Sequence, residues 1–177
     1  DGIKSGKKDD RWIFTEILLR NEFLAGAALA SSSRALKSID ADLSKECLAF
    51  AKTCWERYDE NTKDHLEPHT LFAVELYLAT QEAKYLNWIV SNLDLILEKP
   101  ENIWLVARLR QVINQEEVLG NKLSAYKKWL NTSSDSCPFE IPFIDILTAK
   151  QKSKGSTWGI SNKIMELGYK NYFVHKA

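Results

Sequence analysis

The residues with the most obvious metal-binding chemistry are His65, Glu67 and His69, which lie close together in the chain. Two imidazoles converge on one metal ion when they lie four residues apart on the same helix. Pro68 stands between them, and proline disfavours a helix that runs through such a stretch. We therefore expect a polar loop here, and we predict neither a metal site nor a cofactor.

Carboxylates are the next candidates, because pairs of them serve as general acid and base. Asp9-Asp10 and Glu116-Glu117 are sequence neighbours, and neighbours point in different directions, so we interpret them as solvated charge. Glu75 differs, because it lies within the apolar stretch "LFAVELY". A buried carboxylate needs a partner or a raised pKa, and we expect a structural, hydrogen-bonded role. No catalytic residue is predicted, and no phosphate loop or nucleophile motif occurs in the sequence.

The three cysteines carry little information about function. Cys47 and Cys54 are seven residues apart on one expected helix, which separates their Cα atoms by about 10 Å, too far for a disulfide. Cys137 falls in an expected loop. We interpret these residues as two small buried apolar side chains and one loop thiol.

Aromatic residues offer a third kind of chemistry. The chain has six tryptophans, and Trp12, Trp104 and Trp158 fall at or near the expected start of a helix. A flat apolar ring at a helix end, with polar neighbours, suits stacking against a sugar ring. The alternative for each of them is packing in the core.

The bulk composition limits the classes of partner. The 177 residues suffice for one domain, and lysine plus arginine balance aspartate plus glutamate at 24 each. A net charge of zero provides no long-range attraction for nucleic acid or an anionic membrane. No apolar run approaches the length that spans a bilayer.

An apolar period of 3.6 residues dominates the chain and predicts the elements that position these residues. We expect helices over about 21–38, 43–58, 68–80, 85–97, 101–114 and 116–130, and a last one from residue 160. A polar N-terminal arm (1–15) and a long loop (131–157) complete the single domain. The pattern predicts an all-α array of antiparallel hairpins. The first and third helices are apolar or small on most faces and the second, fourth and sixth carry more charge, which favours two concentric layers, as in a toroid.

Several stretches, in order, resemble glycoside hydrolase family nine, the inverting cellulases and endoglucanases. "LFAVELYLATQEAKYLNWI" is similar to the family's "A-x-x-L-Y-x-A-T-G-x-x-x-Y-L" segment, with Gln81 in place of the glycine. "TWGISNKIMELGYKNYFVHKA" is similar to a family helix that opens with Trp-Gly, and "RWIFTE" with the two helices after it resembles the pair that follows the catalytic aspartates.

The resemblance implies part of an (α/α)6 toroid that acts on β-1,4-linked glucans or related polysaccharides. Its inverting mechanism needs two carboxylates about 6.5–9.5 Å apart. The family's Asp-x-x-Asp base motif and its acid glutamate fall outside the matched region, so we expect this chain alone to be inactive. Trp158 matches a substrate-stacking tryptophan of the family, and Trp104 matches another at the start of its helix. Asn162 stands where family members often carry a sugar-binding arginine.

The last helix has no glycine cap, proline or polar tail before Ala177, which we interpret as an internal cut in a secreted or periplasmic hydrolase. The open edge of a partial toroid would expose apolar faces, so we expect self-association there. A polysaccharide is the expected ligand. The alternative is a non-catalytic helical-repeat module that binds a protein or a glycan through its concave face.

Overall fold

A computed structural model describes residues 18–57, 65–135 and 160–177 of the chain. The N-terminal arm with Trp12, the loop residues 136–159 with Cys137 and Trp158, and Tyr58 at the expected end of the second helix lie outside the described residues. The described parts consist of helices joined by turns and contain no strand, which confirms the predicted all-α class.

The first two helices form an antiparallel hairpin. It consists of α1 (Leu19–Leu36) and α2 (Ala41–Glu56). Asp40 begins α2 as its N-cap, because its carboxylate accepts a hydrogen bond of 3.0 Å from the backbone N–H of Leu43. Only one side of α1 is buried, whereas the sequence predicted small or apolar character on most of its faces.

α1 also packs closely against α3 (Leu66–Thr80). Gly26 makes this approach possible, because a Cβ atom at this position would lie 2.2 Å from Cζ of Phe72. The ring of Phe72 is fully buried, so it fills the space that a side chain at residue 26 would need.

The helix α3 begins two residues before the predicted start, and Pro68 lies within its first turn. Proline is tolerated there because the N–H groups of the first turn have no acceptor inside the helix. α3 ends at Gln81, which adopts the left-handed conformation at φ 60° and donates its backbone N–H to the carbonyl of Tyr77. This is the helix-ending geometry that glycine usually provides.

The structure corrects two predicted helices. The helix expected over 85–97 is divided at Asn92 into α4 (Ala83–Ser91) and α5 (Leu93–Leu97), and the side chain of Asn92 donates to the carbonyl of Trp88 at 2.8 Å. The helix expected over 101–114 is a 3-10 turn, η2 (Pro100–Asn102), followed by the short α6 (Ile103–Ala107). Residues 108–113 then form turns with several i→i+3 hydrogen bonds.

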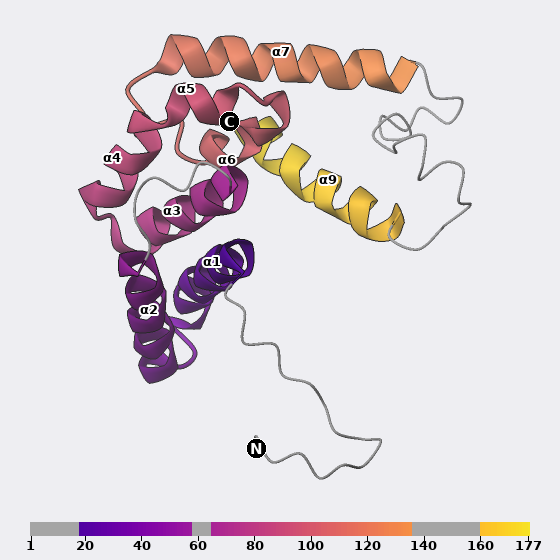
Figure 1. Ribbon diagram of the computed structural model, residues 1–177. Coiled ribbons are helices and arrows are strands. Elements are labelled where there is room, and N and C mark those ends of the chain that lie inside the picture. The colour runs from indigo at the N-terminus through magenta and orange to yellow at the C-terminus, as the bar shows by residue number, and fades with distance from the viewer. Residues whose placement is uncertain (1–17, 58–64, 136–159) are drawn as a thin grey trace, which may run out of the picture.

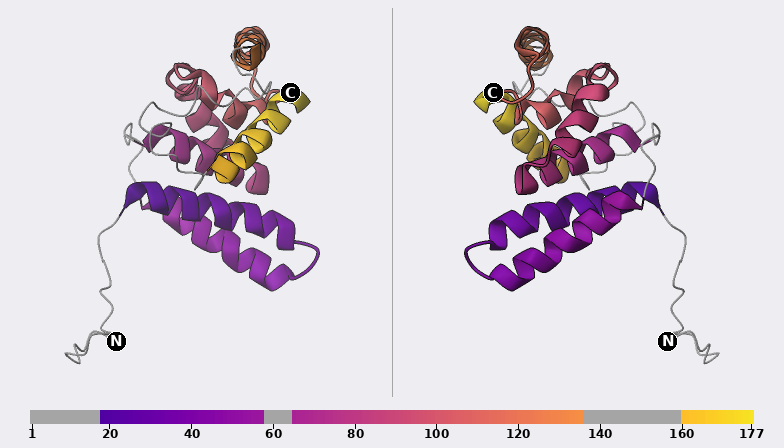
Figure 2. Two further views of the ribbon diagram at one scale, coloured as in Figure 1. Left: turned by 90° about the vertical axis from the view of Figure 1, so that its right-hand side faces the viewer. Right: turned by 90° about the vertical axis from the view of Figure 1, so that its left-hand side faces the viewer.

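The remaining helices are α7 (Glu116–Asp135) and α9 (Ile160–Lys176). Residues 131–135 belong to α7, so the loop predicted over 131–157 does not begin at residue 131. α7 and the α1–α2 hairpin lie at opposite ends of the molecule in Figure 1 and Figure 2. α9 packs mainly against α6 (Figure 1).

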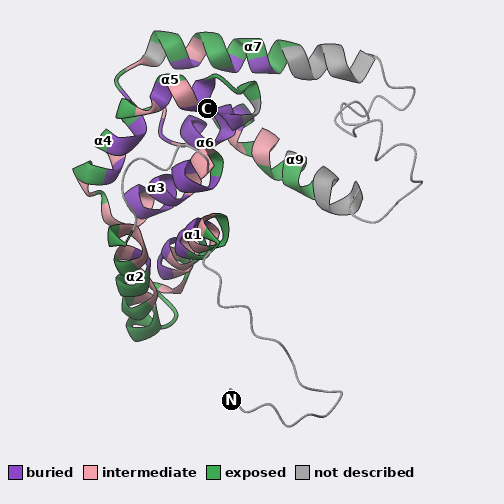
Figure 3. Ribbon diagram, in the orientation of Figure 1, coloured by how far each residue is buried: buried purple, intermediate pink, exposed green. Residues whose placement is uncertain are grey.

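Burial separates inner from outer helices. α3 is buried along most of its length, and all five residues of α6 are buried, whereas α2 has Ala51 as its one buried residue (Figure 3). The described part of α7 is largely exposed (Figure 3). The core therefore centres on α3 and α6. None of the described helices is long and apolar enough to cross a membrane.

Candidate functional site

The histidine that suggested a metal ligand is a core residue. His69 is 3% exposed and stacks on Phe23 with ring centroids 4.3 Å apart and planes 7° from parallel. The rings of Trp88 and Trp55 also pack against it, with centroids 4.2 and 4.9 Å from that of His69. Burial lowers the pKa of His69 from 6.5 to about 4. His69 lies in α3, within the helix predicted over 68–80, so the prediction of a polar loop at this residue was wrong. Pro68 lies in the first turn of the helix, where proline does not prevent one.

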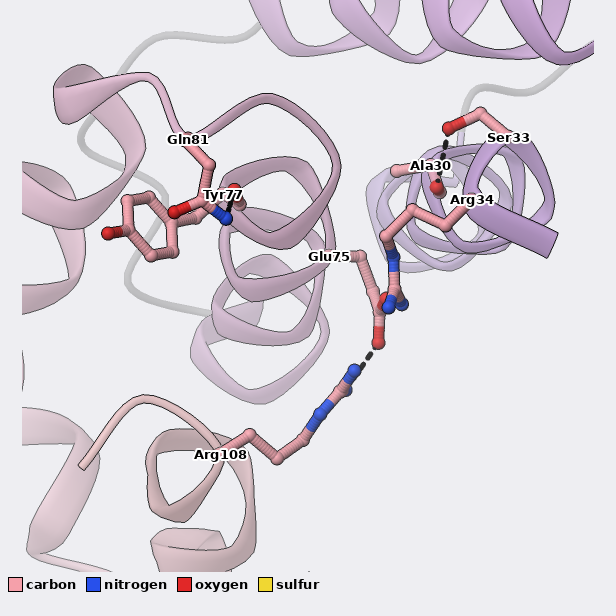
Figure 4. Close-up of polar contacts among 7 residues, drawn as sticks. All are labelled: Ala30, Ser33, Arg34, Glu75, Tyr77, Gln81 and Arg108. Atoms are coloured by element: carbon pink, nitrogen blue, oxygen red, sulfur yellow. Dashed lines mark hydrogen bonds and ion pairs between the residues drawn. The ribbon is translucent and has the colours of Figure 1, made fainter. Parts of the chain in front are cut away.

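Glu75 carries the central polar contacts of the core. It is 4% exposed and lies on α3 between Arg34 of α1 and Arg108, the residue that follows α6 (Figure 4). Each carboxylate oxygen accepts a hydrogen bond from one of the two guanidinium groups. We call these three residues the Glu75 cluster. Glu75 has the structural, hydrogen-bonded role that its sequence context indicated.

The Glu75 cluster fixes Arg108 next to a cavity. The side chain of Arg108 is 9% exposed. Its guanidinium carbon lies 4.6 Å from the ring centroid of Phe173 on α9, so the cation rests against an aromatic face. A charged group held from two sides loses little further freedom when it binds a ligand.

The cavity has a volume of about 370 Å³ and lies between α9 and the turns that follow α6. We call it the α6–α9 pocket. Its polar and aromatic lining residues are Arg108, Arg110, Gln111, Tyr172, Phe173 and Lys176. No aspartate or glutamate is among the described residues that line it. Tyr172 is 56% exposed, and the ammonium of Lys176 lies 5.7 Å from the centroid of its ring.

A second cavity continues the α6–α9 pocket along the turns. It measures about 470 Å³ and shares Arg110, Gln111 and Ala177 with the first. Arg110 donates a hydrogen bond to the backbone oxygen of Ala177, which ties the turns after α6 to the end of α9. The two cavities therefore adjoin each other along residues 107–114.

Of the residues that sequence reasoning proposed for sugar binding, Trp104 is the one with a described side chain, and it does not line this pocket. Trp104 is 5% exposed and packs edge-on against Tyr169 at 5.9 Å. It therefore has the core-packing arrangement that was the alternative for each tryptophan. Trp158 lies outside the described residues, and Asn162 lies in α9 without a described side chain.

Sequence reasoning missed the pocket residues. The sequence did not single out Arg108 or Arg110, which were expected inside the helix over 101–114, whereas the helix α6 ends at Ala107. Tyr172 and Lys176 did have a signal, since they lie four residues apart and therefore on one face of α9.

The cysteines and the metal-binding residue types have no special arrangement among the described residues. Cys47 and Cys54 are free thiols, as their spacing indicated, but they are half-buried, whereas the sequence predicted buried side chains. Within the described residues, no group of three or more His, Cys, Asp or Glu side chains is arranged to hold a metal ion.

Comparison with known proteins provides no family. No protein-family model matches the chain, and neither a curated protein nor a solved structure shows significant similarity to it.

Proposed function

We propose that this chain binds a polysaccharide as part of an inverting glycoside hydrolase of the cellulase type, without itself supplying the catalytic carboxylates. The α6–α9 pocket carries this proposal. It places the rings of Tyr172 and Phe173 beside the polar side chains of Arg110 and Gln111. Sugar sites combine a flat apolar surface with convergent hydrogen-bonding groups in this manner.

The arrangement of the helices supports the same proposal. The buried helices α3 and α6 are flanked along the chain by the more exposed α2 and α7, and the half-exposed α4 and the short α5 lie between them. Two layers of antiparallel helices are the architecture of an (α/α)6 toroid, of which this chain would form a part. The order of the stretches that resemble glycoside hydrolase family nine adds to this support.

The chemistry of the described carboxylates favours a binding role. Glu75 is the one carboxylate among the described residues that is buried, and guanidinium groups engage both of its oxygens. An acid or base for glycoside hydrolysis must instead face the substrate or a water molecule. Hydrolysis would therefore require carboxylates beyond those described, and a secreted or periplasmic location would give such an enzyme access to polysaccharide.

Calorimetric titration with a tetramer of β-1,4-linked glucose tests the proposal. We expect binding without release of shorter sugars, and we expect Tyr172→Ala to weaken binding about two- to tenfold through loss of the stacking ring. Trp158→Ala tests the tryptophan that the resemblance indicates. Met165→Ala is the matched control, since Met165 is 64% exposed on the same helix and does not line the pocket.

Two results would overturn parts of the proposal. Release of shorter sugars from the tetramer would contradict the absence of catalytic carboxylates. No detectable binding of any β-1,4-linked glycan would contradict the polysaccharide ligand itself.

A second candidate is a non-catalytic helical module that binds a protein, including a second copy of this chain. Met165, Tyr169 and Tyr172 favour it, because they are each at least 50% exposed and recur at helical spacing along α9. Such an exposed apolar stripe is typical of interaction surfaces. Sedimentation of the wild type and of Tyr169→Lys distinguishes the candidates, because self-association through α9 should be lost in the variant, whereas glycan binding in the pocket should remain.

A further inference from the structure

The α6–α9 pocket has an electrostatic character that a site for a neutral sugar does not need. Three cationic side chains line it, from Arg108, Arg110 and Lys176, and neither aspartate nor glutamate is among its described lining residues. The whole chain has no net charge, so this concentration of positive charge is local.

The Glu75 cluster does not neutralise this charge. Glu75 supplies one carboxylate, which Arg34 and Arg108 share. The cluster therefore keeps a net positive charge, and Lys176 adds to it, whereas Arg110 is engaged with the backbone oxygen of Ala177. Because the side chain of Arg108 is 9% exposed, water screens its charge less than it would on an open surface.

The geometry of Arg108 suits an anion with two acceptor oxygens. A guanidinium has five N–H donors in a planar fork, and Arg108 uses one of its terminal nitrogens for Glu75. The ring of Phe173 lies 4.6 Å from the guanidinium carbon and limits the movement of the fork on that side. Planar guanidinium groups bind carboxylates through two parallel hydrogen bonds, which makes a fixed arginine selective for them.

The aromatic rings indicate what carries the anion. Tyr172 offers an exposed ring beside Lys176, and a pyranose ring can stack on it while its carboxylate reaches the cations. A small inorganic anion would fill little of a cavity of about 370 Å³. The adjoining cavity along residues 110–114 leaves room for a neighbouring sugar unit.

We propose that the α6–α9 pocket binds a uronic acid unit, so that the polysaccharide is an acidic one. This inference rests on the proposed function and names its substrate class. The cations of the pocket contact the carboxylate at C6, and Tyr172 stacks on the sugar ring. A neutral glucan unit in the same position has no carboxylate and cannot form the charge-assisted hydrogen bonds.

The experiment compares two tetramers that differ only at C6, one of β-1,4-linked glucuronic acid and one of β-1,4-linked glucose, by calorimetric titration of the whole chain. We expect the acidic tetramer to bind at least about tenfold more tightly, from one or more charge-assisted hydrogen bonds. Raising the salt concentration should weaken binding of the acidic tetramer and leave the neutral one unchanged.

Lys176→Gln and Arg110→Gln should each remove most of the preference for the acidic tetramer. Lys127→Gln is the matched control, because Lys127 is an exposed lysine on α7 that does not line the pocket. Thermal unfolding of each variant checks that α9 remains in place, which matters most for Arg110 because it also holds the backbone of Ala177. Lys176→Gln remains decisive if Arg110→Gln unfolds.

The outcomes separate the two proposals. Equal affinity for both tetramers, unchanged in Lys176→Gln, overturns the uronate assignment and leaves the polysaccharide function standing. Absence of binding by both overturns the polysaccharide function as well. If inorganic phosphate displaces the acidic tetramer at concentrations near the tetramer's own dissociation constant, the pocket recognises charge alone and the sugar assignment is wrong.

Discussion

The contact between Gly26 on α1 and Phe72 on α3 permits a sharp test of the packing. In Gly26→Ala, the new methyl group would lie 2.2 Å from one ring carbon of Phe72 and 2.6 Å from two others. Carbon atoms in van der Waals contact lie about 3.5–4.0 Å apart. The ring or the whole of α1 must therefore move by roughly 1 Å or more.

The ring of Phe72 has little room to move. It is 0% exposed, and Trp55 meets it edge-on with ring centroids 5.4 Å apart. Overpacking a core of this kind costs about 1–3 kcal/mol. Replacing glycine by alanine inside a helix by itself raises the free energy of unfolding by up to about 1 kcal/mol, because alanine has the higher helix propensity. We expect Gly26→Ala to lower the free energy of unfolding by about 2 kcal/mol, and to lower the melting temperature by about 4–8 °C.

The chain contains its own controls for helix propensity. A methyl group added at Gly120 on α7 or at Gly168 on α9 would meet no neighbouring atom within 4 Å. Gly120→Ala and Gly168→Ala should therefore raise the free energy of unfolding, by up to about 1 kcal/mol each. Urea unfolding followed by circular dichroism measures all three variants. The packing explanation is refuted if Gly26→Ala is as stable as the two controls.

Three further predictions concern charge and capping. The pKa of His69 falls from 6.5 to about 4 on folding, so its neutral form stabilises the fold above pH 6.5 and this stability is lost as the pH falls from 6.5 towards 4. Between neutral pH and about pH 5 the wild type should lose about 2 kcal/mol more than His69→Phe in urea unfolding, and equal losses would contradict this. Glu75→Gln should lower the free energy of unfolding by about 3 kcal/mol, because it leaves the guanidinium of Arg108 buried without its carboxylate. The exposed control Glu67→Gln should change the free energy of unfolding by about 0.5 kcal/mol or less. Asp40→Ala should cost about 1 kcal/mol through loss of the N-cap of α2, and a melting temperature equal to the wild type would contradict it.

The sequence was sufficient to predict the position of those helices whose apolar period is uninterrupted. α2 and α3 lie within two residues of their predicted starts, and the buried Glu75 was identified as a residue that needs a partner. The sequence could not identify Arg34 and Arg108 as the partners of Glu75, because they lie 41 and 33 residues away from it along the chain. Pairing over such distances is decided by tertiary packing and leaves no local pattern.

The errors have local physical causes. The apolar period favoured a continuous helix over 101–114, but beyond Ala107 the chain tightens into i→i+3 turns. These turns bring Arg108 to Glu75 and Arg110 to Ala177. The break at Asn92 arises because its side chain donates to a backbone carbonyl one turn earlier. The α6–α9 pocket was missed because the turns form one of its walls.

The Glu75 cluster has a consequence for how the protein opens. Its three residues tie α1, α3 and the end of α6 to a single buried carboxylate, so separation of any one of these elements exposes an uncompensated charge. Partial opening inside this group is therefore disfavoured, and the three elements should exchange their amide hydrogens as one cooperative unit. The helix α7 contributes no residue to the Glu75 cluster, and its described surface is largely exposed. Its amides should therefore exchange through smaller openings that leave the core intact.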